Sequence, residues 1–202
     1  FGPMPAERVI HLLRQACGAL SEAHAAGLIH RDIKPGNLFV AQRGGVYDVT
    51  KLLDFGLVTP ILDEQPIQLT ADGSVTGSPL FMSPEQATGE EHADHRSDIY
   101  SLGAVGYCML CGRPPFMGDK PIKVMIAHAH DDPEPPSQHY GGIPTDLEAV
   151  MMRCLAKDPA DRFADAASLE RALAECEAAD RWGAEQAAAW WQDQQQEVPV
   201  WQ

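Results

Sequence analysis

The chain of 202 residues carries 15 Lys and Arg against 29 Asp and Glu, which gives a formal net charge of −14 at pH 7. Such an acidic chain lacks the basic face that nucleic-acid binding requires, and its 45% hydrophobic content is ordinary for a soluble globular protein. Five scattered cysteines argue against a disulfide framework and favour a cytoplasmic compartment, and there is no run of about 18 apolar residues to span a membrane.

The first predicted elements are a long helix and a small hairpin. Residues 5–26 repeat apolar side chains at helical spacing, at Val9, Ile10, Leu12, Leu13, Ala16, Cys17 and Leu20. Gly27 is expected to end this helix because glycine tolerates a positive φ. Residues 38–40 and 51–53 are predicted to be strands around a turn at 43–45, which would hold the loop at Asp32 beside Asp54.

The middle of the chain is predicted to contain a long loop followed by a buried helix. Residues 57–82 are rich in Thr, Pro, Asp and Gly and have weak periodicity, as a long functional or disordered loop has. Residues 99–110 are almost wholly apolar and predict a helix that crosses the core. Further helices are predicted at residues 122–128, 146–156 and 165–178, so the fold class is mainly α with a small β-hairpin.

The end of the chain is predicted to be a helical tail rich in Trp and Gln. We place its boundary so that residues 1–178 form one domain and 179–202 the tail. The neighbouring Trp190 and Trp191 could form a partner-binding patch. The favoured interpretation is that the tail folds back and buries one face against the domain.

Two patterns that look like metal sites are interpreted as ordinary structure. Cys108 and Cys111 have zinc-like spacing, but they sit in an apolar helix with no second ligand pair, so core packing is favoured. The histidines in polar stretches have no third ligand at a defined offset, and we expect them on the solvated surface; they are His92, His95, His128 and His130.

Three motifs occur in the order and approximate spacing of the protein-kinase signature set. Residues 30–37 read His-Arg-Asp-Ile-Lys-Pro-Gly-Asn, residues 54–56 read Asp-Phe-Gly, and residues 83–85 read Ser-Pro-Glu. Any one triplet could arise by chance, but the three in order are far more specific. The chain therefore resembles the large lobe of a Ser/Thr protein kinase.

The resemblance assigns catalytic roles to residues of the first two motifs. It implies that Asp32 orients the substrate hydroxyl and takes its proton, and that Lys34 reaches the γ-phosphate of ATP, a lysine here being the mark of Ser/Thr specificity. Asn37 and Asp54 would hold Mg²⁺ through oxygen atoms, and Phe39 would join them and Lys34 in the nucleotide site. The less favoured alternative is that Asp32 and Asp54 merely form turns.

Other residues match structural positions of the family. His30 and Phe55 match a pair that stacks in the hydrophobic column coupling the two lobes. Asp98 matches the aspartate that holds the catalytic loop; it could also cap its helix, and both roles are compatible. Glu85 and Arg162 match a buried ion pair, which we expect to be costly to break.

The long loop is the expected regulatory element. Arg31, directly before the catalytic acid, is typical of kinases in which this arginine pairs with a phosphorylated loop residue. Bacterial kinase loops carry two phosphorylated threonines near this point; Thr70 falls on the first position, and Asp72, already negative, on the second. The competing sites are Ser74 and Thr76. Ser78 stands where kinases have threonine, near the acceptor residue.

The sequence contains no glycine-rich loop, strand lysine or helix glutamate of the family's small lobe. We therefore expect a fragment, a partial catalytic domain over residues 1–178, which alone binds ATP weakly and transfers phosphate poorly. The whole enzyme is expected to use ATP and Mg²⁺ to phosphorylate Ser and Thr hydroxyls of protein substrates, and a homodimer for autophosphorylation is compatible with this.

The competing hypothesis is a non-catalytic kinase-like interaction or scaffold module, which would act through its helices and the Trp-rich tail. The intact catalytic residues favour the enzyme. The sequences of residues 82–86, Met-Ser-Pro-Glu-Gln, and 112–116, Gly-Arg-Pro-Pro-Phe, resemble those of bacterial kinases in particular. Such proteins often continue into a membrane anchor and a sensor, so the parent protein could be anchored beyond residue 202.

Overall fold

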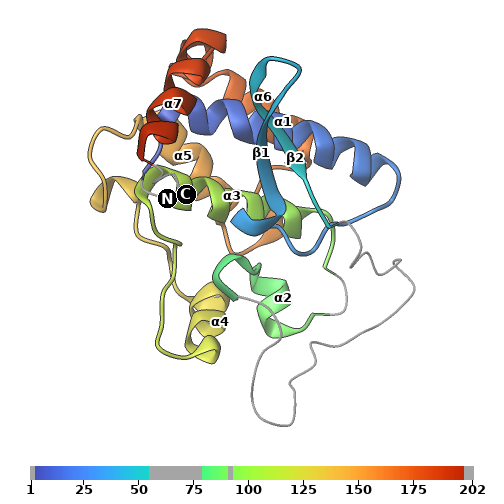
Figure 1. Ribbon diagram of the computed structural model, residues 1–202. Helices are drawn as coiled ribbons and strands as arrows, with labels where there is room; N and C mark the ends of the chain where they lie inside the picture. The colour runs from blue at the N-terminus through green and yellow to red at the C-terminus, as the bar shows by residue number, and fades with distance from the viewer. Residues whose placement is uncertain (1–2, 55–78, 91–92, 198–202) are drawn as a thin grey trace, which may run out of the picture.

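The computed structural model describes residues 3–54, 79–90 and 93–197, and its first element is the amphipathic helix α1 (Ala6–Ala25). The apolar residues that predicted this helix are buried in the core, and Gly27 follows its end with φ of 75°. The predicted helix and its stop are therefore confirmed. Helix α1 packs against α6 (Ala166–Ala174), against β2 (Val46–Leu52) and against the central helix α3 (Arg96–Cys111) (Figure 1).

The predicted hairpin is present and is longer than expected. Strand β1 (Leu38–Arg43) pairs antiparallel with β2 (Val46–Leu52). A two-residue glycine turn joins them, with φ of 58° at Gly44 and 85° at Gly45. Positive φ at both turn residues is the geometry that matches the twist of the flanking strands, and glycine adopts it without steric cost.

The base of the hairpin joins the two chain segments that carry the candidate metal ligands. The backbone N–H of Leu53 donates to the carbonyl of Asn37 at 2.9 Å, one residue beyond the paired strands. Asn37 ends the short 3-10 helix η1 (Pro35–Asn37), and Asp54 directly follows Leu53. The hairpin therefore brings the loop of Asp32 and the segment of Asp54 together, as expected.

Helix α3 (Arg96–Cys111) is the buried helix predicted at residues 99–110. Its contact with α5 (Thr145–Cys154) depends on a glycine. A Cβ added at Gly103 would lie 2.3 Å from the Cβ of Cys154, which is closer than any real contact. The absence of a side chain at this position lets the two helices approach each other.

The remaining helical elements complete the body of the fold. They are η3 (Pro79–Phe81), α2 (Pro84–Thr88), α4 (Pro121–His130), η4 (Pro136–Gln138) and η5 (Pro159–Asp161). Figure 1 shows α2 and α4 side by side at the end of the molecule away from α1, and they are in contact. The short helix α2 was not predicted; it is stabilised by a capping box formed by Ser83 and Gln86.

The tail folds back onto the body. After η6 (Ala179–Arg181), helix α7 (Ala184–Glu197) packs against β2. The indole N–H groups of Trp182 and Trp191 both donate to Asp48 of β2. The interpretation that the tail buries one face is therefore confirmed for its described part. None of the described helices is long and apolar enough to cross a membrane.

The prediction of surface histidines is wrong for His128. Its exposed fraction is 0%, its Nδ1 lies 2.8 Å from the hydroxyl of Tyr100, and its ring packs edge-on against Phe116. The polar sequence around it misled the prediction, because His128 lies on the inner face of α4.

Cys111 lies at the end of α3, where its Sγ donates to the carbonyls of Tyr107 and Arg113.

Candidate active site

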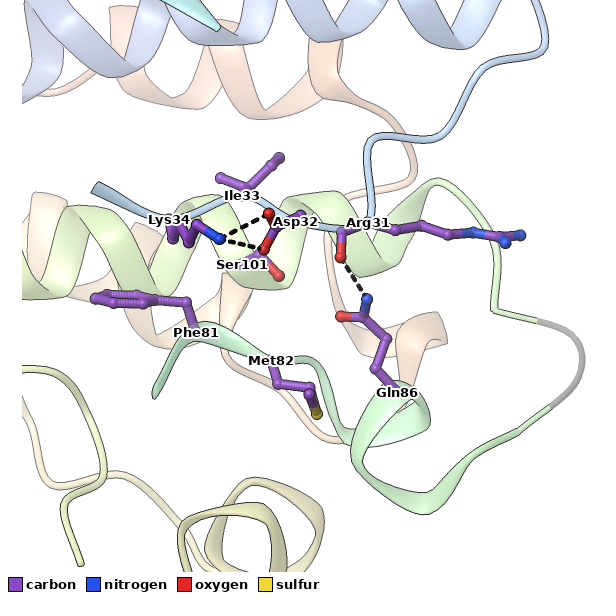
Figure 2. Close-up of a pocket in the computed structure, with 8 residues that line it drawn as sticks. All are labelled: Arg31, Asp32, Ile33, Lys34, Phe81, Met82, Gln86 and Ser101. Carbon is purple, nitrogen blue, oxygen red and sulfur yellow. Dashed lines mark hydrogen bonds and ion pairs between the residues drawn. The ribbon is translucent and has the colours of Figure 1, made fainter. Parts of the chain in front are cut away.

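The centre of the candidate site is the carboxylate of Asp32, on which a lysine and an asparagine converge. Lys34 Nζ lies 2.8 and 3.0 Å from its two oxygens (Figure 2). The amide nitrogen of Asn37 donates to the Asp32 carbonyl at 2.8 Å and to Oδ2 at 3.0 Å. About a third of the Asp32 and Lys34 side chains remains exposed, 30% and 32% respectively, so both are accessible from solution.

Asp98, in the first turn of α3, holds the backbone of this loop. Its two carboxylate oxygens accept the N–H groups of His30 and Arg31, each at 2.8 Å. Arg31 has φ of 62°, an unusual conformation for a residue with a side chain, and the buried carboxylate compensates for it. Asp98 thus occupies the loop-holding position expected of it. The residue at the N-cap of α3 is His95, which makes no capping bond.

Two further residues that the sequence analysis missed hold the same loop. Gln86 Nε2 donates to the carbonyl of Arg31 at 2.7 Å (Figure 2), and His24 Nε2 lies 2.8 Å from Asp98 Oδ2. Gln86 directly follows the Ser-Pro-Glu triplet, and that position was a usable signal. His24 carried no signal, because nothing in its sequence context shows that α1 and α3 meet there.

The base of the hairpin offers oxygen atoms to a divalent cation. Asp54 is exposed and has φ of 60°, and the backbone bond between Leu53 and Asn37 keeps it near the catalytic loop. The amide nitrogen of Asn37 makes two hydrogen bonds, so the amide oxygen is the side-chain atom that could bind a cation. Carboxylate and amide oxygens suit Mg²⁺. Phe39, expected in the nucleotide site, is 52% exposed on β1.

A small hollow of about 40 Å³ lies beside Asp32. It is lined by residues 31–34, by the segment before α2, by α2 and by α3 (Figure 2). The lining residues are Arg31, Asp32, Ile33, Lys34, Phe81, Met82, Gln86 and Ser101. The volume of this hollow holds only a few water molecules. The hollow is therefore far too small to enclose a nucleotide.

The ion pair between Glu85 and Arg162 is present and buried. Both carboxylate oxygens of Glu85 accept guanidinium N–H bonds at 2.8 Å, and Ser97 Oγ donates to one of them at 2.6 Å. Burial opposes ionisation of Glu85, but the bonds from Arg162 and Ser97 outweigh it and hold its pKa below the usual value. The pair ties α2 to the segment before α6.

Several predicted residues lie outside the described part of the chain: Phe55, Thr70, Asp72, Ser74, Thr76 and Ser78. The other half of the expected stack, His30, is completely buried, and its Nε2 lies 2.9 Å from the carbonyl of Leu53. The side chain of Arg31 extends away from Asp32 in Figure 2, and its buried Nε has no hydrogen-bond partner among the described residues.

The family model of the protein kinase domain matches residues 2–174. The chain belongs to the protein kinase family. It is 44% identical to serine/threonine-protein kinase PknB of Mycobacterium leprae and 42% identical to PknB of Mycobacterium tuberculosis, each over 172 residues and 85% of this chain. It is 40% identical over 171 residues to serine/threonine-protein kinase Pkn1 of Myxococcus xanthus, again over 85% of this chain.

These findings confirm the resemblance to bacterial Ser/Thr kinases and the fold class, mainly α with one hairpin. The family generally uses ATP and Mg²⁺ and acts on proteins. The chain spans about a quarter of the length of the curated relatives, 26% for both PknB proteins and 24% for Pkn1.

Proposed function

We propose that this chain is the large-lobe part of an enzyme that transfers the γ-phosphate of ATP to Ser and Thr hydroxyls of proteins. The observation that carries the proposal is the convergence of Lys34 and Asn37 on the carboxylate of Asp32. A partly exposed lysine and carboxylate in contact add little stability, so stability alone gives this cluster no strong reason to form.

Each residue of the cluster has a definite task in this proposal. The Asp32 carboxylate accepts a hydrogen bond from the substrate hydroxyl and orients it. It takes the hydroxyl proton as the bond from that oxygen to the γ-phosphorus forms and the bond from the γ-phosphorus to the ADP oxygen breaks, so that ADP leaves. Lys34 neutralises negative charge on the transferred group, and Asn37 keeps the Asp32 side chain in place. Oxygens of Asn37 and Asp54 would hold Mg²⁺, which would supply further positive charge beside the phosphates.

Regulation through the long loop is part of the proposal. A phosphate added to Thr70, with Asp72 providing a second negative charge, would find in Arg31 a guanidinium whose Nε has no partner among the described residues. Ser74 and Thr76 are the competing sites. A phosphopeptide map of the active protein decides between them: modification at Thr76 with Thr70 unmodified would rule out this assignment.

The test of the function is ATP-dependent phosphorylation of a Ser- or Thr-containing protein by the native polypeptide. We expect Asp32→Asn to reduce the rate by about 10²–10⁴-fold, because it removes the proton acceptor. The thermal unfolding midpoint should not change, because the partly exposed ion pair with Lys34 that it breaks contributes little stability. Asp132→Asn, at an exposed position after α4, is the matched control and should leave the rate unchanged. No transfer by the native polypeptide, or an unaffected Asp32→Asn variant, would instead favour a non-catalytic interaction module.

A further inference from the structure

Asp48 is a buried carboxylate that the proposed chemistry does not use. It lies on β2 with an exposed fraction of 1% and φ of 55°. The strand register explains this unusual backbone angle. Ala41 pairs with Val49 and Arg43 pairs with Val46, so between these two pairs β2 contains one residue more than β1. Such a β-bulge redirects a side chain, and here the bulge brings Asp48 into contact with α1 and the tail.

Four N–H groups surround the two oxygens of Asp48. Oδ1 accepts from Arg8 Nη2 at 2.8 Å and from Trp191 at 2.7 Å, and Oδ2 accepts from Arg8 Nε at 2.9 Å and from Trp182 at 3.0 Å. The guanidinium of Arg8 also stacks on the ring of Trp190, 4.5 Å from its centroid. Burial opposes the ionisation of Asp48, but these donors hold its pKa below the usual value.

This cluster fixes the middle of the hairpin on two sides. Next to it, Gln15 of α1 donates to the carbonyl of Asp48 at 2.8 Å and accepts the N–H of Thr50 at 3.0 Å. A two-stranded hairpin has little stability of its own and depends on what packs against it. The tail supplies half of the donors to Asp48, although it lies beyond residue 174, where the match to the kinase family ends.

We propose that Trp182 and Trp191 are positioning residues of the candidate site. By holding Asp48 they fix the hairpin, and the hairpin fixes Asn37 relative to Asp54 through the backbone bond between Asn37 and Leu53. The inference rests on the proposed function, because there Asn37 and Asp54 are the metal ligands. The tail is accordingly a working part of the catalytic unit, and it acts on both ligands through Asp48 and the hairpin.

The test is amide hydrogen exchange in the native polypeptide without nucleotide. The double variant Trp182→Phe/Trp191→Phe keeps aromatic rings but removes both N–H donors. Exchange of the hairpin amides, Leu53 included, should become at least about tenfold faster, as expected for losing hydrogen bonds to a buried charge. The amides of the core helix α3 are the internal reference and should not change. Asp193→Ala, at an exposed position of α7, is the matched control.

Three results would overturn the inference. Unchanged exchange at Leu53 would show that the tail does not hold the hairpin, and equal acceleration in α3 would show a general loss of stability. Faster exchange in α7 alone would show a docked but passive tail. If the double variant does not fold, each single Trp→Phe variant is measured against the same expectation at several-fold. Because no phosphate transfer is measured, failure of the proposed kinase activity would leave the exchange result intact.

Discussion

The buried pair of Glu85 and Arg162 allows the sharpest prediction about stability. Arg162→Met removes the guanidinium and leaves the Glu85 carboxylate with only Ser97 as a side-chain donor. It also removes the donor from three backbone carbonyls, those of Arg96, Ala156 and Lys157. Glu85→Gln should be milder, because the Arg162 guanidinium keeps its hydrogen bonds to these carbonyls. It also keeps its contact with the ring of Tyr100, whose centroid lies 5.0 Å away.

The magnitude follows from the burial of both groups. The side chain of Arg162 is 0% exposed and that of Glu85 is 6% exposed, so removing one partner leaves a charge that water cannot solvate. Breaking such a pair costs about 3–5 kcal/mol. We expect Arg162→Met to fall in that range and Glu85→Gln to cost less. Against a typical domain stability of about 5–15 kcal/mol, Arg162→Met removes a large fraction of the total.

Urea unfolding followed by circular dichroism measures both costs, and an unchanged m-value shows that the two unfolding reactions are comparable. Lys123→Gln is the control, because its partner Asp119 lies on the surface, and its loss should cost less than about 1 kcal/mol. The reasoning is refuted if Arg162→Met costs no more than this control, or if Glu85→Gln costs more than Arg162→Met.

Two further predictions concern a buried histidine and a glycine contact. Burial lowers the pKa of His128 to about 4, so between about pH 4 and 6.5 only the unfolded chain binds this proton, and stability rises with pH. His128→Gln should remove about 3 kcal/mol of that rise in urea titrations, and an unaltered pH dependence would contradict this. Gly103→Ala should destabilise by about 1–3 kcal/mol, because its Cβ meets Cys154. Gly18→Ala, in open space on α1, should stabilise by about 1 kcal/mol, and similar melting shifts for both would contradict the contact.

Much of the site was predictable because its residues are close together in the sequence. Asp32, Lys34 and Asn37 lie within six positions, so a short motif contains the whole cluster. The helices were predicted from the spacing of their apolar residues, which directly reflects which face is buried. The pair of Glu85 and Arg162 was predicted only through the family resemblance, since nothing local connects residues 77 positions apart.

What could not be predicted depends on contacts between distant segments. Trp190 and Trp191 suggested a folded-back tail, but the sequence did not indicate what the tail contacts. Asp48, the partner of Trp182 and Trp191, is 134 and 143 residues away, and only the bulge in β2 brings it to the tail. His128 was misplaced because polarity of the flanking residues says nothing about the inward face of a short helix. His24 was missed because its partner Asp98 is on another helix, and the sequence does not show that the two helices meet there.

The hydrogen bonds to Asp98 have a consequence for the order of events during synthesis. They link Asp98 to His24, His30 and Arg31, across 67 to 74 positions of chain. At about 5–20 residues per second, the ribosome needs several seconds to reach Asp98 after the catalytic loop has been made. Throughout that interval the loop has its acid and lysine, but the N–H groups of His30 and Arg31 lack the carboxylate that accepts them. The nascent loop therefore acquires its shape late, after α3 has emerged and packed against α1.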